Sequence, residues 1–231
     1  MDNEDFYVPS SPVKKYKVLI GSAPRMQPFD ESSDSLIAMI NFTQSAGIGI
    51  FLEKIRRGAP GWHHLGVMIS HCIKYDCTHL FLAADDMLYP ADTLIRLVRA
   101  DKDVISGIYR KSYVNRLEPA NPCDTAEEWN KKYEEQGVYE THFVPGHTML
   151  LKREVLEKMI IDYPELAYTN PAYPDETHYG FSLPMIEDKR AYENDWALSL
   201  RAKRSGFKLW ADFGCRLKHY CGEFLGFELE E

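Results

Sequence analysis

The chain has 231 residues, and its 45% hydrophobic and 27% charged residues are typical of a globular protein, which excludes disordered and collagen-like classes. It carries 27 Lys and Arg against 35 Asp and Glu, so its net charge is −8 with the histidines neutral. Proteins that bind nucleic acid by neutralising phosphates show the opposite balance, and we therefore expect no nucleic-acid partner. An anionic ligand would need local help from a metal ion, a helix N-terminus or a few arginines.

The sequence shows no targeting or membrane segment. No run approaches the ~18 consecutive apolar residues of a transmembrane helix, and the acidic, Ser/Pro-rich start has no apolar signal segment. The five cysteines are odd in number and form no CxxC pair, which is typical of reduced thiols in a cytoplasmic protein. We therefore expect a cytoplasmic protein without a membrane span. A zinc site built from Cys215, His219 and Cys221 would lack a clear fourth ligand.

The first half of the chain is expected to alternate strands with helices. Short apolar runs predict strands at residues 16–20, 48–52, 78–83 and 104–109. Apolar residues at helical spacing predict intervening helices that begin near residues 32, 62 and 91. This alternation predicts an α/β fold with a mainly parallel sheet and right-handed crossovers.

The second half is less regular. Residues 110–140 read as an insertion that contains one helix, and strands are expected at 142–144, 148–151 and 208–211. Helices are expected at 153–160 and 195–205, whereas residues 162–192 show no period and are typical of a functional loop. Because the composition never breaks, we expect a flexible leader at residues 1–15 and one domain at residues 16–231.

The strongest chemical signal is the pair Asp85–Asp86 at the carboxyl end of a predicted buried strand. Ligands of open α/β sheets bind beyond these strand ends, and hard divalent ions prefer oxygen ligands. A metal site that bridges to a phosphate therefore fits the pair, although the two aspartates could equally cap the following turn. Taken alone, the pattern does not separate these interpretations.

Three weaker signals accompany the pair. Asn194–Asp195 begins the predicted late helix, where plain N-capping would also explain these residue types. His219 follows the final strand, and a lone histidine there is more often structural than a ligand. Arg110 ends the strand at 104–109 beside the same edge of the sheet, and a solvated basic strand end is the simpler interpretation.

Together, these features resemble a known family. The order ADDM, SGIYRKS, PGHTMLLKREVLEKM and NDWALSLRAKRSGFKLWADFGCRLKH resembles the small GT-A glycosyltransferases, family 2-like enzymes of phages, bacteria and large algal viruses. The resemblance covers residues 16–220 and implies a single-domain GT-A fold, α/β, with a central mostly parallel mixed sheet flanked by helices. Members usually carry a DxD motif that holds a divalent ion against the diphosphate of the donor.

The resemblance assigns roles to residues of this chain. The DxD motif falls on Ala84, Asp85 and Asp86, so its first aspartate is missing, and Asp86 is left as the metal ligand. His219 resembles the additional metal ligand of many GT-A enzymes, and Asp195 resembles the general base of inverting members, with Asn194 as a departure. Residues that fall where the family binds the nucleotide or lines the donor and acceptor cleft are Ser22, Ala23, Pro24, Arg25, Glu53, His64, Ala84, Asp85, Arg110 and Gly146.

The implied activity is transfer of a sugar from a nucleotide-diphosphate donor, with a UDP-sugar expected, to a hydroxyl of a glycan or glycoprotein. Mn²⁺ or Mg²⁺ is the expected cofactor, and inversion the expected stereochemistry. A nucleotidyltransferase acting on sugar phosphates stays open, although Gly21–Arg25 is only a thin version of its Gly-rich phosphate loop. The missing first aspartate also leaves open a non-catalytic module that binds nucleotide sugars or glycans. Resemblance to viral enzymes further implies viral glycosylation in the cytoplasm of a host.

Overall fold

A computed structural model describes the chain over residues 16–22, 30–54, 61–113, 116–119, 126–171, 173–220 and 224–225. The predicted leader at 1–15 and the predicted site residues Ala23, Pro24 and Arg25 lie outside these ranges. Among the described residues, no helix is both long and apolar enough to cross a bilayer.

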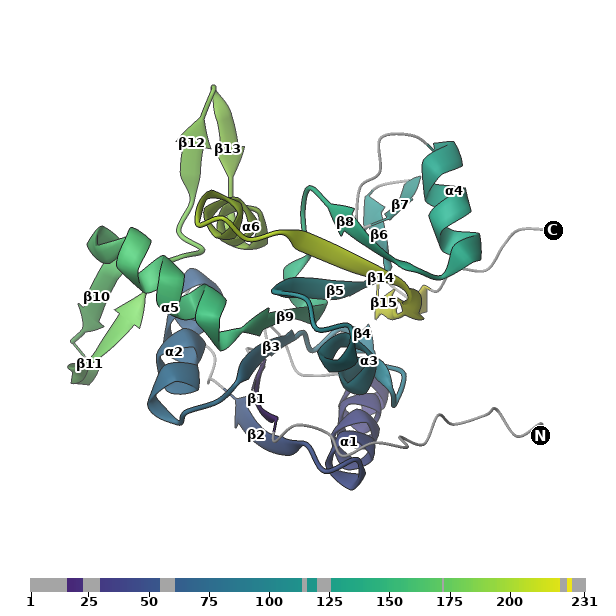
Figure 1. Ribbon diagram of the computed structural model, residues 1–231, viewed down its shortest axis with the longest axis horizontal. Coiled ribbons are helices and arrows are strands. Elements are labelled where there is room, and N and C mark those ends of the chain that lie inside the picture. The colour runs from purple at the N-terminus through teal and green to yellow at the C-terminus, as the bar shows by residue number, and fades with distance from the viewer. Residues whose placement is uncertain are drawn as a thin grey trace.

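A central sheet organises the molecule (Figure 1). Its strand order is β2-β1-β3-β9-β5-β14-β8. Strands β1, β2, β3, β5 and β14 share one direction, whereas β9 and β8 run antiparallel to their neighbours. The expected α/β fold with a mostly parallel mixed sheet is therefore confirmed. The strands are β1 (Lys17–Ser22), β2 (Gly49–Lys54), β3 (His79–Ala83), β5 (Val104–Ile108), β8 (Val138–Thr141), β9 (Met149–Lys152) and β14 (Leu209–Arg216).

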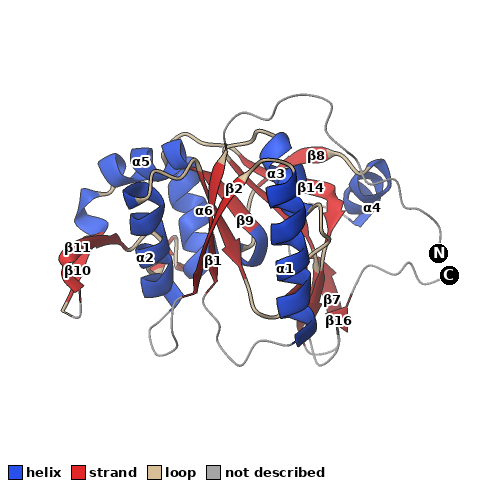
Figure 2. Cartoon of the chain, turned by 90° about the horizontal axis from the view of Figure 1, so that it is seen from below, coloured by secondary structure: helices blue, strands red, loops and turns tan. Residues whose placement is uncertain are grey.

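Helices cover both faces of this sheet (Figure 2). Helices α1 (Asp30–Ser45) and α3 (Thr93–Arg99) pack on one face, and α2 (Gly61–Lys74), α5 (Arg153–Asp162) and α6 (Asn194–Arg204) pack on the other. The alternation of side chains along β1 explains the two cores, because successive residues of a strand point to opposite faces. Val18 and Ile20 join the core under α1 and α3, whereas Leu19 joins the core under α2, α5 and α6.

Part of the predicted insertion at 110–140 belongs to the central sheet, and the rest lies outside it. Helix α4 (Ala126–Glu135) packs against β14, and β8 then adds an antiparallel edge strand to the central sheet. The expected strand at 142–144 is wrong, because the strand ends at Thr141 and the chain then turns toward the 3-10 helix η1 (Gly146–Thr148). The remaining elements of this stretch are β6 (Arg110–Tyr113) and β7 (Arg116–Pro119), which pair with each other.

The segment 162–192 is also more regular than expected. After the 3-10 helix η2 (Pro164–Leu166) it forms two hairpins, β10 (Ala167–Asn170) with β11 (Tyr173–Tyr179) and β12 (Met185–Glu187) with β13 (Arg190–Tyr192). The turn of the second hairpin places Asp188 and Lys189 at φ of +48° and +64°. Such turns usually carry Asn-Gly or Asp-Gly, and their absence here hides the hairpin from sequence-based prediction. Figure 1 shows this hairpin projecting from the body beside α6.

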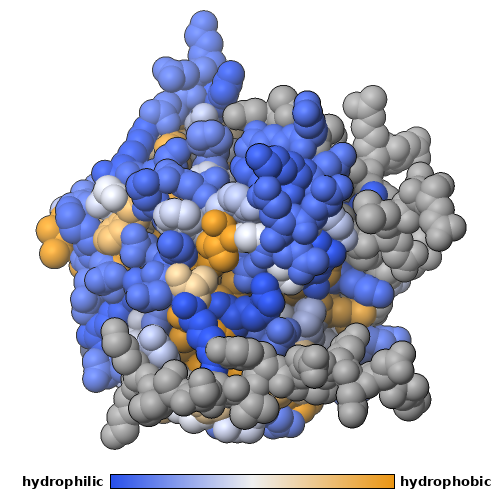
Figure 3. All heavy atoms as spheres, turned by 45° about the vertical axis from the view of Figure 1, so that its right-hand side comes forward, coloured by the Kyte–Doolittle hydropathy of each residue, from blue (hydrophilic) through white to orange (hydrophobic). Residues whose placement is uncertain are grey.

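A second small sheet lies at the carboxyl ends of the main strands. Strand β4 (Met87–Leu88) pairs with β15 (Lys218–Tyr220), which also pairs with β16 (Phe224–Leu225). The pairing places His219 opposite Met87, one residue after the predicted ligand Asp86. On the face shown in Figure 3, the described surface is mainly hydrophilic, and apolar side chains gather near its middle.

Candidate metal-binding cleft

A cleft of about 880 Å³ opens where β1 and β3 end and α2 and α6 begin. This place agrees with the general position of ligands in open α/β sheets. Residues from these elements and from η1 and β15 form its walls. It brings together seven of the predicted site residues, namely His64, Ala84, Asp85, Asp86, Gly146, Asp195 and His219.

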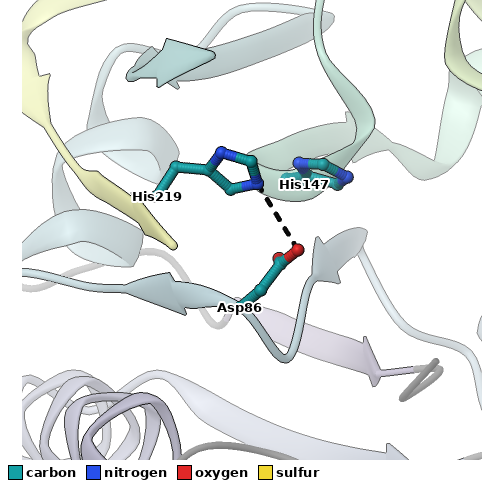
Figure 4. A group of neighbouring side chains, drawn as sticks. All are labelled: Asp86, His147 and His219. Carbon is teal, nitrogen blue, oxygen red and sulfur yellow. Dashed lines mark ion pairs between the residues drawn. The ribbon is translucent and has the colours of Figure 1, made fainter. Parts of the chain in front are cut away.

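Three side chains at one end of the cleft could hold a metal ion. Asp86, His147 and His219 each offer one ligand atom, and these atoms lie within 4.8 Å of one another. The His219 Nε2 atom is 3.4 Å from the Asp86 Oδ2 atom. Figure 4 shows the two imidazoles and the carboxylate pointing toward a common space. Two imidazole nitrogens with one carboxylate oxygen are a donor set that suits divalent transition metals.

Backbone pairing fixes two of these groups. The Tyr220 backbone N–H donates to the Asp86 carbonyl at 2.9 Å, in line with the β4–β15 ladder. The ladder therefore ties the turn after β3 to the strand that carries His219. His219 is 9% exposed, so its ring is held by the structure around it.

The third group arrives on an antiparallel strand. Strand β9 lies between β3 and β5 and runs against both, so it begins at the edge of the sheet where they end. The preceding 3-10 helix thereby places His147 beside the other two ligands. Its Nδ1 atom is 3.0 Å from the Tyr109 hydroxyl. When Nδ1 carries the proton and donates it to that hydroxyl, the Nε2 atom carries the lone pair that a metal requires.

Tyr89 connects the two loops that supply these ligands. Its hydroxyl accepts from the Ala84 backbone N–H at 2.8 Å and lies 3.1 Å from both the Ala84 and the His147 carbonyl oxygens. Burial of the side chain raises the pKa of Tyr89 well above its ordinary value, so the hydroxyl stays protonated. Tyr89 therefore acts as a positioning residue for Asp86 and His147.

Asp195 lines the same cleft. Its Oδ2 atom accepts the Gly146 backbone N–H at 2.9 Å, and its Oδ1 atom accepts the Trp196 backbone N–H at 3.1 Å. A Cβ atom at position 146 would lie 3.0 Å from the Asp195 Cβ, so the close approach favours glycine there. Asn194 has a φ of +46°, a left-handed conformation that asparagine tolerates. The predicted pair Gly146 and Asp195 is thus in direct contact.

The charge of the cleft is negative. Its walls carry four carboxylates, those of Asp85, Asp86, Glu193 and Asp195, and within the described part of the chain no Lys or Arg lines it. Like charges at such close quarters repel unless a cation offsets them. A bound cation would offset these carboxylates for an anionic ligand.

Three predicted site residues lie outside the described cleft wall. Ser22 is buried at the end of β1, and Arg110 begins β6. Glu53 forms an ion pair with His71 of α2, and this contact raises the pKa of His71. Cys215 is 2% exposed in the core under α1 and α3, away from the cleft, and Cys221 lies outside the described residues.

His147 and Tyr109 belong to the site but are absent from the predicted set. The available signal for His147 was its place next to Gly146, in the segment expected to line the cleft. The sequence does not show the order of the strands, and position 147 reaches Asp86 because β9 lies between β3 and β5.

Comparisons with known proteins support the fold. No protein-family model and no curated protein sequence matches the chain. The chain is similar to the crystal structure of A197 from STIV, with a TM-score of 0.51, 14% identity and coverage of 91% of this chain and 88% of that one. GalNAc-T7 with UDP, GalNAc and Mn²⁺ gives a TM-score of 0.48 at 10% identity, covering 88% of this chain and 43% of that one. The catalytic domain of Drosophila beta1,4-galactosyltransferase 7 with xylobiose gives a TM-score of 0.44 at 12% identity, and the match covers 85% of this chain and 65% of that one. The first of these likenesses shows a shared fold.

Proposed function

We propose that the protein is a metal-dependent glycosyltransferase that moves a sugar from a UDP-sugar donor to a hydroxyl group on a glycan or glycoprotein. The observation that carries the proposal is one cleft that holds both the group Asp86, His147 and His219 and the carboxylate of Asp195. The first group fits a divalent cation, and the second is a proton acceptor of the kind that activates a hydroxyl.

The charge of the cleft supports metal dependence. A nucleoside diphosphate is an anion, and the described walls offer it four carboxylates and neither Lys nor Arg. Asp86, His147 and His219 would hold the ion that reverses this balance. When bound, such an ion supplies Lewis-acid neutralisation of the diphosphate as it leaves.

The donor set favours Mn²⁺ over Mg²⁺. Mg²⁺ binds oxygen ligands and water, whereas two of the three groups here are imidazoles. We therefore expect measurable Mn²⁺ binding in the absence of nucleotide, and weaker binding of Mg²⁺ under the same conditions.

Asp195 is the proposed general base. The two backbone N–H groups that donate to it hold its carboxylate at a fixed place on the cleft wall. The acceptor hydroxyl would give its proton to this carboxylate while its oxygen attacks the anomeric carbon from the side opposite the diphosphate. One carboxylate acting in this way inverts the anomeric configuration.

The test is a panel of nucleotide sugars incubated with the protein and Mn²⁺, with release of the nucleoside diphosphate as the readout. Turnover of a UDP-sugar supports the proposal, and an inverted anomeric configuration of the product supports the role of Asp195. The Asp195→Asn variant should lose roughly 10²-fold or more in rate while keeping its affinity for UDP and Mn²⁺. Turnover that requires pyrophosphate and a sugar phosphate would instead show a nucleotidyltransferase. Binding of the donor without any turnover would show a non-catalytic module.

A further inference from the structure

Trp196 is the residue that directly follows the proposed base, and its side chain is 41% exposed. It lines the same cleft as Asp195 and is among the few large hydrophobic side chains with this much exposure in the described residues. An aromatic ring in a cleft wall, bordered by polar groups, is a common feature of ligand sites.

The indole is held firmly in place. The Phe143 ring stacks on it with centroids 3.9 Å apart and an interplanar angle of 12°, and Phe143 itself is 4% exposed. The Trp196 backbone N–H lies 3.0 Å from the Glu193 carbonyl and 3.1 Å from the Asp195 Oδ1 atom. Because Phe143 covers one face of the indole, the exposed area belongs to the other face and the ring edge. Little conformational entropy is lost when a ligand packs on such a fixed ring.

The three residues that precede Trp196 in sequence are polar or acidic. Glu193, Asn194 and Asp195 line the cleft next to it, and Tyr192 lies 6.4 Å away at the end of β13. A sugar ring matches the surface, because its C–H face is apolar and its hydroxyl groups bond to carboxylate and amide groups.

We infer that Trp196 is the platform for the acceptor, and that the acceptor is a neutral sugar ring whose C–H face packs on the indole. This inference rests on the proposed function and assigns its acceptor site. Trp196 directly follows Asp195 and both residues line the cleft, so the platform lies in the same cleft as the group proposed to take the proton of the attacking hydroxyl. The carboxylates of Glu193 and Asp195 repel an acidic sugar such as a uronic acid, which selects for a neutral ring.

The test measures saccharide binding by saturation-transfer NMR without donor or metal, so it does not depend on turnover. The ligands are lactose, cellobiose, maltose, chitobiose, a disaccharide of glucuronic acid and a lysine-rich peptide. We expect the C–H protons of a neutral disaccharide to be saturated in the presence of the parent protein. Trp196→Ala and Trp196→Leu should bind the same disaccharide about tenfold more weakly. Trp196→Leu keeps an apolar side chain against Phe143, so it remains informative if the alanine variant is destabilised.

Trp210→Phe is the matched control, since Trp210 is a partly buried residue of β14 that contacts Lys102 and does not line the cleft. Its saccharide binding should equal that of the parent. The inference is overturned if Trp196→Leu binds saccharides as tightly as the parent, if no neutral saccharide binds, or if only the acidic sugar or the peptide binds. Binding that depends on Trp196 in a protein that turns over no donor would uphold the platform and refute the transferase.

Discussion

Two groups of histidines in this molecule differ in what their rings contact. The cleft histidines, His147 and His219, converge on the Asp86 carboxylate. The seam histidines, His63, His71 and His178, join helix α2 to the hairpin of β10 and β11, beside which α2 lies in Figure 1. The residue type is the same in both groups, so the chemistry depends on the partners.

The seam uses its histidines as cross-links. The two ring nitrogens of His63 lie 2.8 Å from the Tyr168 hydroxyl and 2.9 Å from the Asn170 side-chain amide. His71 lies between the carboxylates of Glu53 and Glu176. Because both nitrogens of each of these rings contact the protein, neither histidine is suited to bind a metal. The two groups therefore differ in arrangement, because the cleft histidines share a single carboxylate, whereas each of these two seam rings is held at both nitrogens by other side chains.

The largest expected effect comes from removing one of the proposed metal ligands in the cleft. His219→Ala and Asp86→Ala should weaken Mn²⁺ binding by more than roughly 10²-fold, because only two of the three ligands remain. His63→Gln is the matched control and should bind Mn²⁺ as the parent does. Calorimetric titration with MnCl₂ measures all three variants, and equal losses in His219→Ala and His63→Gln would abolish the distinction.

The next effect concerns the positioning of the cleft ligands. Tyr89→Phe removes the hydroxyl that contacts the Ala84 N–H and both carbonyl oxygens. It should lower the free energy of unfolding by about 1–3 kcal/mol, because the hydrogen bonds of the buried hydroxyl group are lost. Mn²⁺ affinity should fall by roughly tenfold as well, since the loops of Asp86 and His147 lose their connection. A variant with reduced stability and parental Mn²⁺ affinity would show that Tyr89 supports only the fold.

The stability of the seam should depend on pH. Burial lowers the pKa of His63 and of His178 below the ordinary 6.5, so protons bind more tightly to the unfolded chain. The free energy of unfolding should therefore fall as the pH drops below 6.5, and it should stop falling once the pH is below the lowered pKa values of the folded protein. His63→Gln should reduce this loss between neutral and mildly acidic pH, as measured by urea unfolding. An unchanged pH dependence in His63→Gln would contradict the assignment.

His71 should act in the opposite direction. Hydrogen bonding to Glu53 raises its pKa above 6.5, so its contribution to stability is complete below pH 6.5 and is lost as the pH rises through the raised value. His71→Gln should therefore cost more stability at acidic than at alkaline pH. Urea unfolding of parent and variant across the same pH series gives the difference. A constant difference at every pH would exclude an ionic role for His71.

The smallest effect belongs to the exposed end of the seam. Glu176→Gln weakens contacts with Lys74 and His71, and the Lys74 side chain is largely in solvent. Because exposed ion pairs contribute little, the free energy of unfolding should fall by less than about 1 kcal/mol. Binding of Mn²⁺ should be unchanged. A loss of several kcal/mol in thermal or urea unfolding would show that the seam depends on this charge rather than on its aromatic contacts.

Much of the fold could be predicted because its signals are local. The buried runs of β1 and β3 and the apolar faces of α2 and α5 are continuous in sequence, so periodicity locates them. Asp86 could be singled out for the same reason, because a carboxylate pair after a buried strand is visible without any contact. His219 and Asp195 followed from their places at element ends and from the resemblance.

The remainder depends on contacts between distant segments. Strand β8 has half-exposed side chains at the edge of the sheet, and its pairing with β14 leaves no clear alternation in sequence. His147 enters the site only because β9 runs antiparallel between β3 and β5, an order that no local pattern records. Glu53 was expected to contact the nucleotide, and in the structure it lies near the end of β2 and pairs with His71. Such contacts become visible only in three dimensions.

The most direct test of the central claim is calorimetric titration of the protein with UDP, once with Mn²⁺ and once with EDTA. The described cleft offers carboxylates and no Lys or Arg, so the account predicts UDP binding that requires Mn²⁺ and is lost in Asp86→Ala. His63→Gln should behave as the parent in both conditions. Equal affinity for UDP with Mn²⁺ and with EDTA would contradict the claim that Asp86, His147 and His219 form the metal site of a nucleotide-binding cleft.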